Sequence, residues 1–259
     1  MPTAIESFQS INRDLTATLK RTSEQPLVAR ESQYYLENIA NIDSIDEFLA
    51  DDRIFRFAMK ASGLEEMTYA KAFIRKVLEE GIDDTKSFAN SLTDKRYKDF
   101  AERFNFERYN ATATTFNRAQ QGTVDAYVQQ VLEEGAGQDN EGVRLALYFQ
   151  RKATSITKTV ELLADPALLK VTETLLGINL SSGDIDRNIA RIEKQIDVTD
   201  LQDPAKLGKL LTRFTAMWEI SQPSSTAAGG IALLFAQPTE AGVGQNLLSS
   251  IQNLKLNGN

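Results

Sequence analysis

The sequence contains no cysteine and no histidine among its 259 residues. Without them the chain has no disulfide, no thiolate nucleophile and none of the ligands that usually hold structural zinc. Catalytic triads that use imidazole as their base are excluded for the same reason. The chemistry that remains uses carboxylate pairs, serine–lysine nucleophiles, or oxygen ligands for calcium and magnesium.

Basic residues are fewer than acidic ones. The chain has 29 Lys and Arg against 36 Asp and Glu, which gives a formal net charge of -7. A negative field repels phosphate backbones, so we predict no nucleic-acid partner. No apolar run reaches the roughly 18 residues of a membrane span, and the first residues lack the basic and apolar regions of a secretory signal. We therefore expect a soluble protein, made in the cytoplasm and without Sec export.

The apolar residues that are present follow the period of an α-helix. Two stripes, one near each end of the chain, repeat at spacings of three and four residues, which places each stripe on one helix face. The first stripe is Ile5, Phe8, Ile11 and Leu15, and the second is Leu247, Ile251 and Leu254. Helical periodicity also dominates between them. The sequence therefore predicts an all-α fold, a multi-helix array with amphipathic helices at both termini.

A Leu-x-Asp pattern occurs four times and indicates an internal repeat. Its aspartates are Asp51, Asp94, Asp165 and Asp203. Asp165 lies 114 positions after Asp51 (165 − 51), and proline follows Asp165 and Asp203 directly. Aspartate before a helix accepts hydrogen bonds from free N–H groups, and proline suits the first helical turn. We predict that all four aspartates are helix caps in a duplicated helix–corner–helix unit, and that Ser44, three residues before a glutamate, is a further cap.

These patterns divide the chain into three parts. Residues 1–24 are expected to form an N-terminal amphipathic helix, and residues 25–220 a repeat-built helical domain. Its two halves are expected at about 25–120 and 121–220. Residues 221–259 begin with a segment rich in serine, alanine and glycine and end in the second stripe, which predicts a linker and a C-terminal amphipathic tail.

Two further expectations concern where helices end. The similar segments 72–81 and 126–135 both finish in Glu-Glu-Gly. Because glycine tolerates the left-handed conformation that ends many helices, we expect both helices to stop there, with the glutamates in a solvated last turn. The longest helix is expected over about 141–163. Its solvated face is expected to carry Arg144, Arg151, Lys152 and Lys158.

No motif predicts a catalytic, cofactor or metal site. Glycine-rich nucleotide loops are missing from the sequence. A calcium-loop candidate begins at Asp184, but Ile189 and Gln195 stand where glycine and glutamate are needed. Adjacent acidic pairs such as Glu65-Glu66 point in different directions on a helix. A carboxylate-dependent hydrolase built from distant residues stays open as a remote alternative.

Four short elements of the first half support a family resemblance. They are Tyr34-Tyr35, Asp51-x-Arg53, Ala61-x-Gly63-Leu64 and Lys76-x-Leu78-Glu79-x-Gly81. With their surroundings they resemble the helical domain of unknown function numbered twelve-seventeen, whose genes tend to lie in flagellar clusters of alphaproteobacteria. The resemblance is close over about 25–106 and looser to about 220. Ala167 and Ile178 replace the equivalents of Arg53 and Leu64, so the second half looks like a diverged copy.

The resemblance implies a non-enzymatic flagellum-associated protein, structural or assisting assembly. Its partners would be flagellar components or further copies of itself, and the flagellar apparatus would export or retain it. A cytoplasmic helical chaperone or regulatory adaptor is the alternative, because it would also be acidic and free of cofactors. In both cases the two terminal stripes are the expected partner-binding surfaces, provided that the protein's own body does not bury them.

Overall fold

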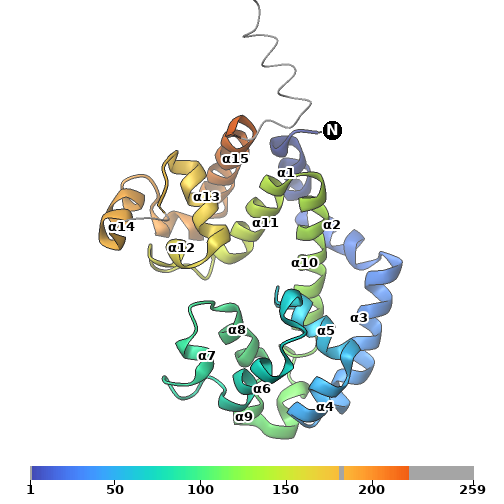
Figure 1. The fold of residues 1–259 in the computed structure, drawn as a ribbon. Helices are drawn as coiled ribbons and strands as arrows, with labels where there is room; N and C mark the ends of the chain where they lie inside the picture. The colour runs from blue at the N-terminus through green and yellow to red at the C-terminus, as the bar shows by residue number, and fades with distance from the viewer. Residues whose placement is uncertain (1, 181–183, 222–259) are drawn as a thin grey trace, which may run out of the picture. The chain divides into compact units, whose positions relative to one another are not determined.

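The computed structural model describes residues 2–180 and 184–221 (Figure 1). These residues form helices joined by loops and turns, with no strand among them, which confirms the all-α multi-helix array. Two compact units divide the chain, Met1–Trp218 and Glu219–Asn259. The second stripe of apolar residues and most of the predicted linker and tail lie outside the described residues.

The helices follow one another closely along the chain. The α-helices are α1 (Ala4–Arg13), α2 (Leu15–Ser23), α3 (Pro26–Asn38), α4 (Ile45–Ala50), α5 (Asp52–Ala61), α6 (Lys71–Glu80), α7 (Phe88–Ser91), α8 (Arg96–Arg103), α9 (Phe106–Tyr109), α10 (Gln121–Asp139), α11 (Glu141–Ala153), α12 (Glu161–Ala164), α13 (Pro166–Leu176), α14 (Ile185–Glu193) and α15 (Pro204–Ser221). The 3-10 helices are η1 (Ile39–Asn41), η2 (Glu65–Met67), η3 (Asn110–Thr115) and η4 (Val198–Gln202).

The N-terminal segment is two helices rather than the single helix expected over 1–24. The break lies at Asp14, whose backbone leaves the helical region at φ -144° and ψ 75°. Its carboxylate accepts a hydrogen bond from the N–H of Ala17 at 2.9 Å and so caps α2. An aspartate whose side chain bonds to nearby backbone groups competes with continuation of the helix. The helical spacing of the apolar residues therefore continues across the boundary between α1 and α2.

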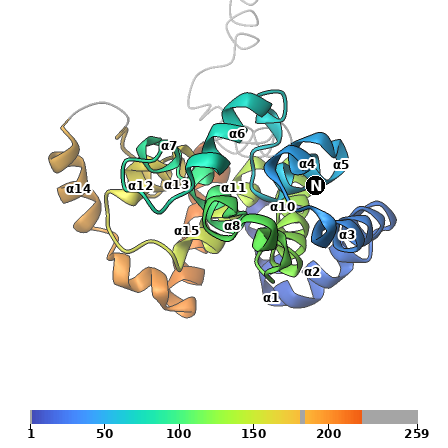
Figure 2. The same ribbon diagram turned by 90° about the horizontal axis from the view of Figure 1, so that it is seen from below.

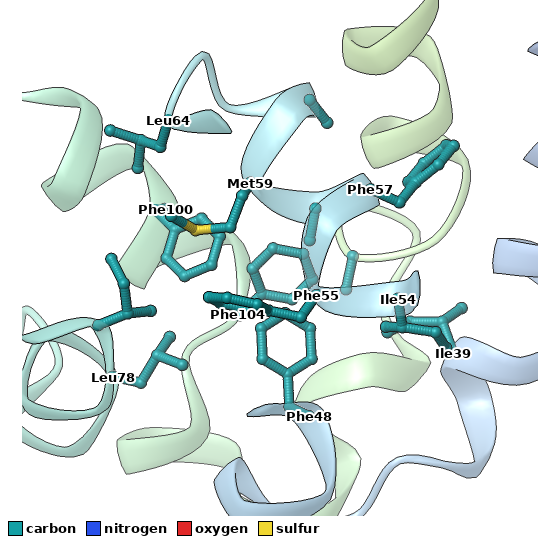
Figure 3. Packing of buried hydrophobic residues seen from close by; sticks show 14 of the residues in the cluster. Ile39, Phe48, Ile54, Phe55, Phe57, Met59, Leu64, Leu78, Phe100 and Phe104 are labelled. Carbon is teal, nitrogen blue, oxygen red and sulfur yellow. The ribbon is translucent and has the colours of Figure 1, made fainter. Parts of the chain in front are cut away.

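The first core holds apolar side chains from α3 to α10 (Figure 3). Aromatic rings dominate its centre, where Phe48 lies 4.9 Å from Phe104 between ring centroids. Phe57 stacks on Tyr127 of α10 at 4.0 Å. Each buried ring of this size removes a large apolar area from water, so this cluster is the main source of stability in the first half.

The second core is formed by α11 to α15 together with Ala4 and Phe8 of α1. Gly142, at the start of α11, touches the ring of Trp218 so closely that a side chain there would collide with it. The long helix α10 serves both cores: Val128 belongs to the first, and Leu132 packs against the second. Both views place α10 and α11 between the α3–α5 helices and the α12–α14 helices (Figure 1 and Figure 2).

Two expected helix ends are wrong. Gly81 ends α6 with a positive φ of 57°, but α10 continues through Gly135 to Asp139. The helix expected over 141–163 stops at Ala153, and α12 begins only at Glu161. The intervening residues are mostly β-branched, and these lose side-chain freedom in a helix, which accounts for the break.

The helix boundaries recur at the offset of 114 residues. α13 starts 114 residues after α5 (166 − 52), and α14 starts 114 residues after α6 (185 − 71). Gly63 and Gly177 follow α5 and α13 with φ of 68° and 65°, a conformation that costs glycine little. These matches support the predicted duplication, which itself stays a prediction.

Candidate functional site

The N-terminal apolar stripe lies partly inside the protein. Phe8 is only 1% exposed and packs in the second core, so its expected contact with a partner is corrected: its own chain covers it. α1 contacts α11, whose buried residues include Phe149 and Leu145. Ile5, Ile11 and Leu15 are half-buried and keep part of their surface at the exterior.

A shallow groove of about 520 Å³ runs between α1 and the junction of α10 with α11. Its lining is Pro2, Glu6, Ser7, Ser10, Ile11, Ala136, Asp139 and Val143. Half of these residues are apolar, and two, Glu6 and Asp139, carry carboxylates. Glu6 accepts hydrogen bonds from the N–H and the hydroxyl of Thr3, and the backbone bond in particular lowers the pKa of its carboxyl. Glu6 is thus charged at neutral pH.

The predicted capping residues lie at helix starts. Asp51, Asp165 and Asp203 each accept hydrogen bonds from two backbone N–H groups of the following helix, at 2.8 to 3.2 Å. Ser44 accepts one from Glu47 at 3.2 Å. Asp94 differs, because it lies one residue before the N-cap of α8. Its carboxylate accepts hydrogen bonds from the guanidinium and the backbone N–H of Arg96.

A tyrosine contacts the corner aspartate in each half, again 114 residues apart. The hydroxyl of Tyr148 donates to Asp165 at 2.5 Å, and that of Tyr34 lies 3.5 Å from Asp51. Burial raises the pKa of Tyr148, and its hydrogen bond to the carboxylate raises it further. Tyr148 therefore stays neutral and donates its proton throughout the physiological range.

One buried ion pair links α10 to α11 at the level of these corners. Glu133 is 1% exposed, and both its carboxylate oxygens accept from Arg151, at 2.7 and 2.9 Å. Burial alone would lower the pKa of Arg151, but the hydrogen bonds to Glu133 outweigh it and raise the pKa. The sequence placed Glu133 in a solvated last turn, and this is wrong because α10 continues past it and α11 packs over it.

Further ion pairs connect α8 to the second half. Lys95 bonds to Glu161 at 3.1 Å, and Asp99 bonds to Lys152 at 2.9 Å. Lys152, like Arg151, was expected on a solvated face of α11 and is instead half-buried in an ion pair. These ion pairs therefore link the two cores. Each of their three carboxylates, on Glu133, Glu161 and Asp99, already has a cationic partner.

Residues 2–180 and 184–221 hold neither a cluster of metal-ligating side chains nor a membrane-spanning helix. No three acidic side chains in this range are grouped so that they could hold a metal ion. None of the helices there combines the length and the apolar character needed to cross a membrane. The groove and the half-buried stripe beside it are candidates for a contact site in this part of the chain.

Comparison with known proteins shows what the chain is similar to. The family model described as "Protein of unknown function (DUF1217)" matches residues 61–207. An X-ray crystal structure of an Agrobacterium tumefaciens protein, a structural genomics target, is 50% identical. That match has a TM-score of 0.79 and covers 84% of this chain and 94% of the other. Comparison with the curated proteins gives no match.

Proposed function

The chain belongs to the DUF1217 family of proteins of unknown function, and from this premise we propose that it is a non-enzymatic, flagellum-associated structural or assembly protein. It acts through contacts between helices, with flagellar components or further copies of itself as partners. The observation that carries this proposal is the groove beside α1, whose lining combines half-buried Ile11 with the carboxylates of Glu6 and Asp139. Such a surface suits an amphipathic helix better than a small substrate.

The engagement of the buried and half-buried acidic side chains also favours a scaffold over a hydrolase. Asp165 caps a helix, and Glu133 and Glu161 neutralise cations of neighbouring helices. A glycosidase-like mechanism needs two carboxyl groups that face each other roughly 5 to 10 Å apart across a substrate site, with neither committed elsewhere. These carboxylates stabilise the fold instead, as expected of a protein whose role is to hold a shape.

The cellular location of the protein tests the proposal. We would blot cytoplasm, purified hook–basal bodies and culture medium, in normal cells and in cells that lack the flagellar export ATPase. We expect the protein in the organelle or the medium of normal cells only. An abundant cytoplasmic enzyme, blotted in the same fractions, controls for lysis.

The alternative, a cytoplasmic chaperone or adaptor, predicts another distribution. The protein would then stay wholly in the cytoplasm of both strains and would form a stoichiometric complex with one client. That outcome would contradict the structural reading, and the client could be identified by pull-down with the full chain.

A further inference from the structure

Helix α14 carries cations that no carboxylate neutralises. Arg187, Arg191 and Lys194 follow one another at spacings of four and three residues, so they share one face. All three are exposed, and no ion pair joins them to another described residue. The stripe they form, here called the basic stripe, runs about 10 Å along the helix. No other helix of the described ranges presents three unpaired cations together.

Helix α6, which starts 114 residues earlier, differs from α14 in the pairing of its cations. The cations of α6 all have partners within the chain: Lys71 binds Asp52 at 2.5 Å and Arg75 binds Asp46 at 2.6 Å, while Lys76 lies 3.7 Å from a glutamate of its own helix. α6 is also covered, because it packs against α4, α7, α8 and α9. α14 has the same place in the helix order but keeps its charges outward.

The inward face of α14 is fully used by its own chain. Ile192 is completely buried, and buried Asn188 donates a hydrogen bond to the carbonyl of Leu180 at 2.9 Å. Among the acidic residues of this region, Asp184 caps the first turn, Glu193 accepts from the hydroxyl of Thr159, and exposed Asp186 forms no ion pair with the stripe. The basic stripe is therefore exposed and available to a complementary surface on another molecule.

The same chain offers a complementary surface elsewhere. The groove beside α1 is lined by apolar and small polar residues and by the carboxylates of Glu6 and Asp139. α1, which lines the groove, and α14 lie apart in both views, so one copy cannot join its own two surfaces (Figure 1 and Figure 2). The stripe is positively charged and Glu6 and Asp139 of the groove are negatively charged, so the stripe of one copy and the groove of another are complementary in charge.

We infer that the basic stripe of α14 docks into the acidic groove beside α1 of a second copy of this chain. The contact joins two different surfaces, so it is head-to-tail and generates a ring or an open filament. The inference rests on the proposed function, because it names a second copy as a partner of the same contact site. The localisation experiment can give its expected result even if the chain does not self-associate. A failure of this inference can therefore be distinguished from a failure of the proposed function.

Sedimentation of the full chain tests the contact. At low ionic strength we expect the mean mass to rise with protein concentration, and to return to that of the monomer at about 0.5 M salt, where exposed charges are screened. The triple variant Arg187→Glu, Arg191→Glu, Lys194→Glu should weaken self-association at least tenfold. A matched control, Lys86→Glu, Lys98→Glu, Lys209→Glu, changes the net charge equally at exposed, unpaired cations elsewhere and should associate as the wild type does.

A charge swap identifies the partner surface. Ser10→Arg with Asp139→Arg makes the groove basic, leaves the Thr3–Glu6 cap intact and places a cation at the end of α10, where the helix dipole favours it. This variant should also associate at least tenfold more weakly, whereas mixing it with the α14 triple variant should restore association. Helical circular dichroism of each variant confirms folding.

Three outcomes would overturn the inference. The wild type stays monomeric at every concentration and salt, or the two charge-reversed variants fail to associate when mixed, or the control variant weakens association as much as the stripe variant does. Binding of a monomeric chain to vesicles of anionic phospholipid, lost in the stripe variant, would also overturn it and would assign the stripe to a membrane surface.

Discussion

At the scale of single residues, Glu133 and Arg151 are the pair that sequence analysis missed. The sequence predicts a solvated helix position for each, because no residue within four positions of either one indicates its ion-pair partner. The echo between residues 72–81 and 126–135 was misleading, since Glu79 is exposed where the matching Glu133 is buried. Only the tertiary structure, in which α11 packs against α10, brings the two side chains together.

Removing one member of this pair should destabilise the protein markedly. Arg151→Met leaves the buried charge of Glu133 without a cationic partner, so we expect the free energy of unfolding to fall by about 3 kcal/mol. The double variant Glu133→Gln, Arg151→Met should lose less than the sum of the two single changes. Urea denaturation followed by circular dichroism measures these values.

A control on the same helix is Arg144→Met, because Arg144 is exposed and lies 3.7 Å from its glutamate. We expect a loss of at most about 0.5 kcal/mol there. Equal losses of unfolding free energy for Arg144→Met and Arg151→Met would show that the buried ion pair stabilises the protein no more than the exposed one does.

At the scale of elements, the corner aspartates link a local sequence signal to helix packing. Asp165 caps α13 and also accepts the hydroxyl of Tyr148 from α11, so it fixes the start of one helix against another. Asp203 caps α15 through hydrogen bonds from two backbone N–H groups. The capping role depends on adjacent residues and is readable from the sequence, whereas the tyrosine contact spans 17 residues.

Replacing the two aspartates should separate these contributions. Asp203→Ala should cost about 1 kcal/mol, as for an ordinary N-cap. Asp165→Ala should cost more, about 2 kcal/mol, because Tyr148 also loses its acceptor. Asp165→Asn keeps an oxygen that can cap and should retain most of the stability, as judged by thermal unfolding. A larger loss for Asp165→Asn than for Asp165→Ala would contradict this account.

At the scale of the whole molecule, the two cores and the helices that connect them decide which apolar faces are free. α1 begins the chain yet packs on α11, so the second core contains residues from both ends of the compact unit Met1–Trp218. Within the N-terminal stripe, Phe8 is covered by its own chain, whereas Ile5, Ile11 and Leu15 keep part of their surface available to a partner. Periodicity alone does not distinguish these two uses.

Truncation of Phe8 tests whether α1 belongs to the second core. Phe8→Ala should lower the free energy of unfolding by about 3 to 5 kcal/mol, since the ring is buried and leaves a cavity. Trp218, the only tryptophan, lies in this core, so its fluorescence reports the change directly.

The matched control is Gln9→Ala, an exposed position on the same helix. We expect it to change stability by at most about 0.5 kcal/mol. If Phe8→Ala were as mild as Gln9→Ala, α1 would be a detachable arm and its full stripe would return as a partner surface.

The sequence by itself determined the local structure of this protein. Helix periods, the capping positions at Ser44, Asp51 and Asp165, and the missing cysteine and histidine chemistry depend on residue identity and on neighbours within about four positions. The tertiary structure alone decided the burial of Phe8, the pairing of Glu133 with Arg151 and the outward charges of α14. These depend on which helix faces meet, and the free energy of that packing comes from residues far apart in the chain.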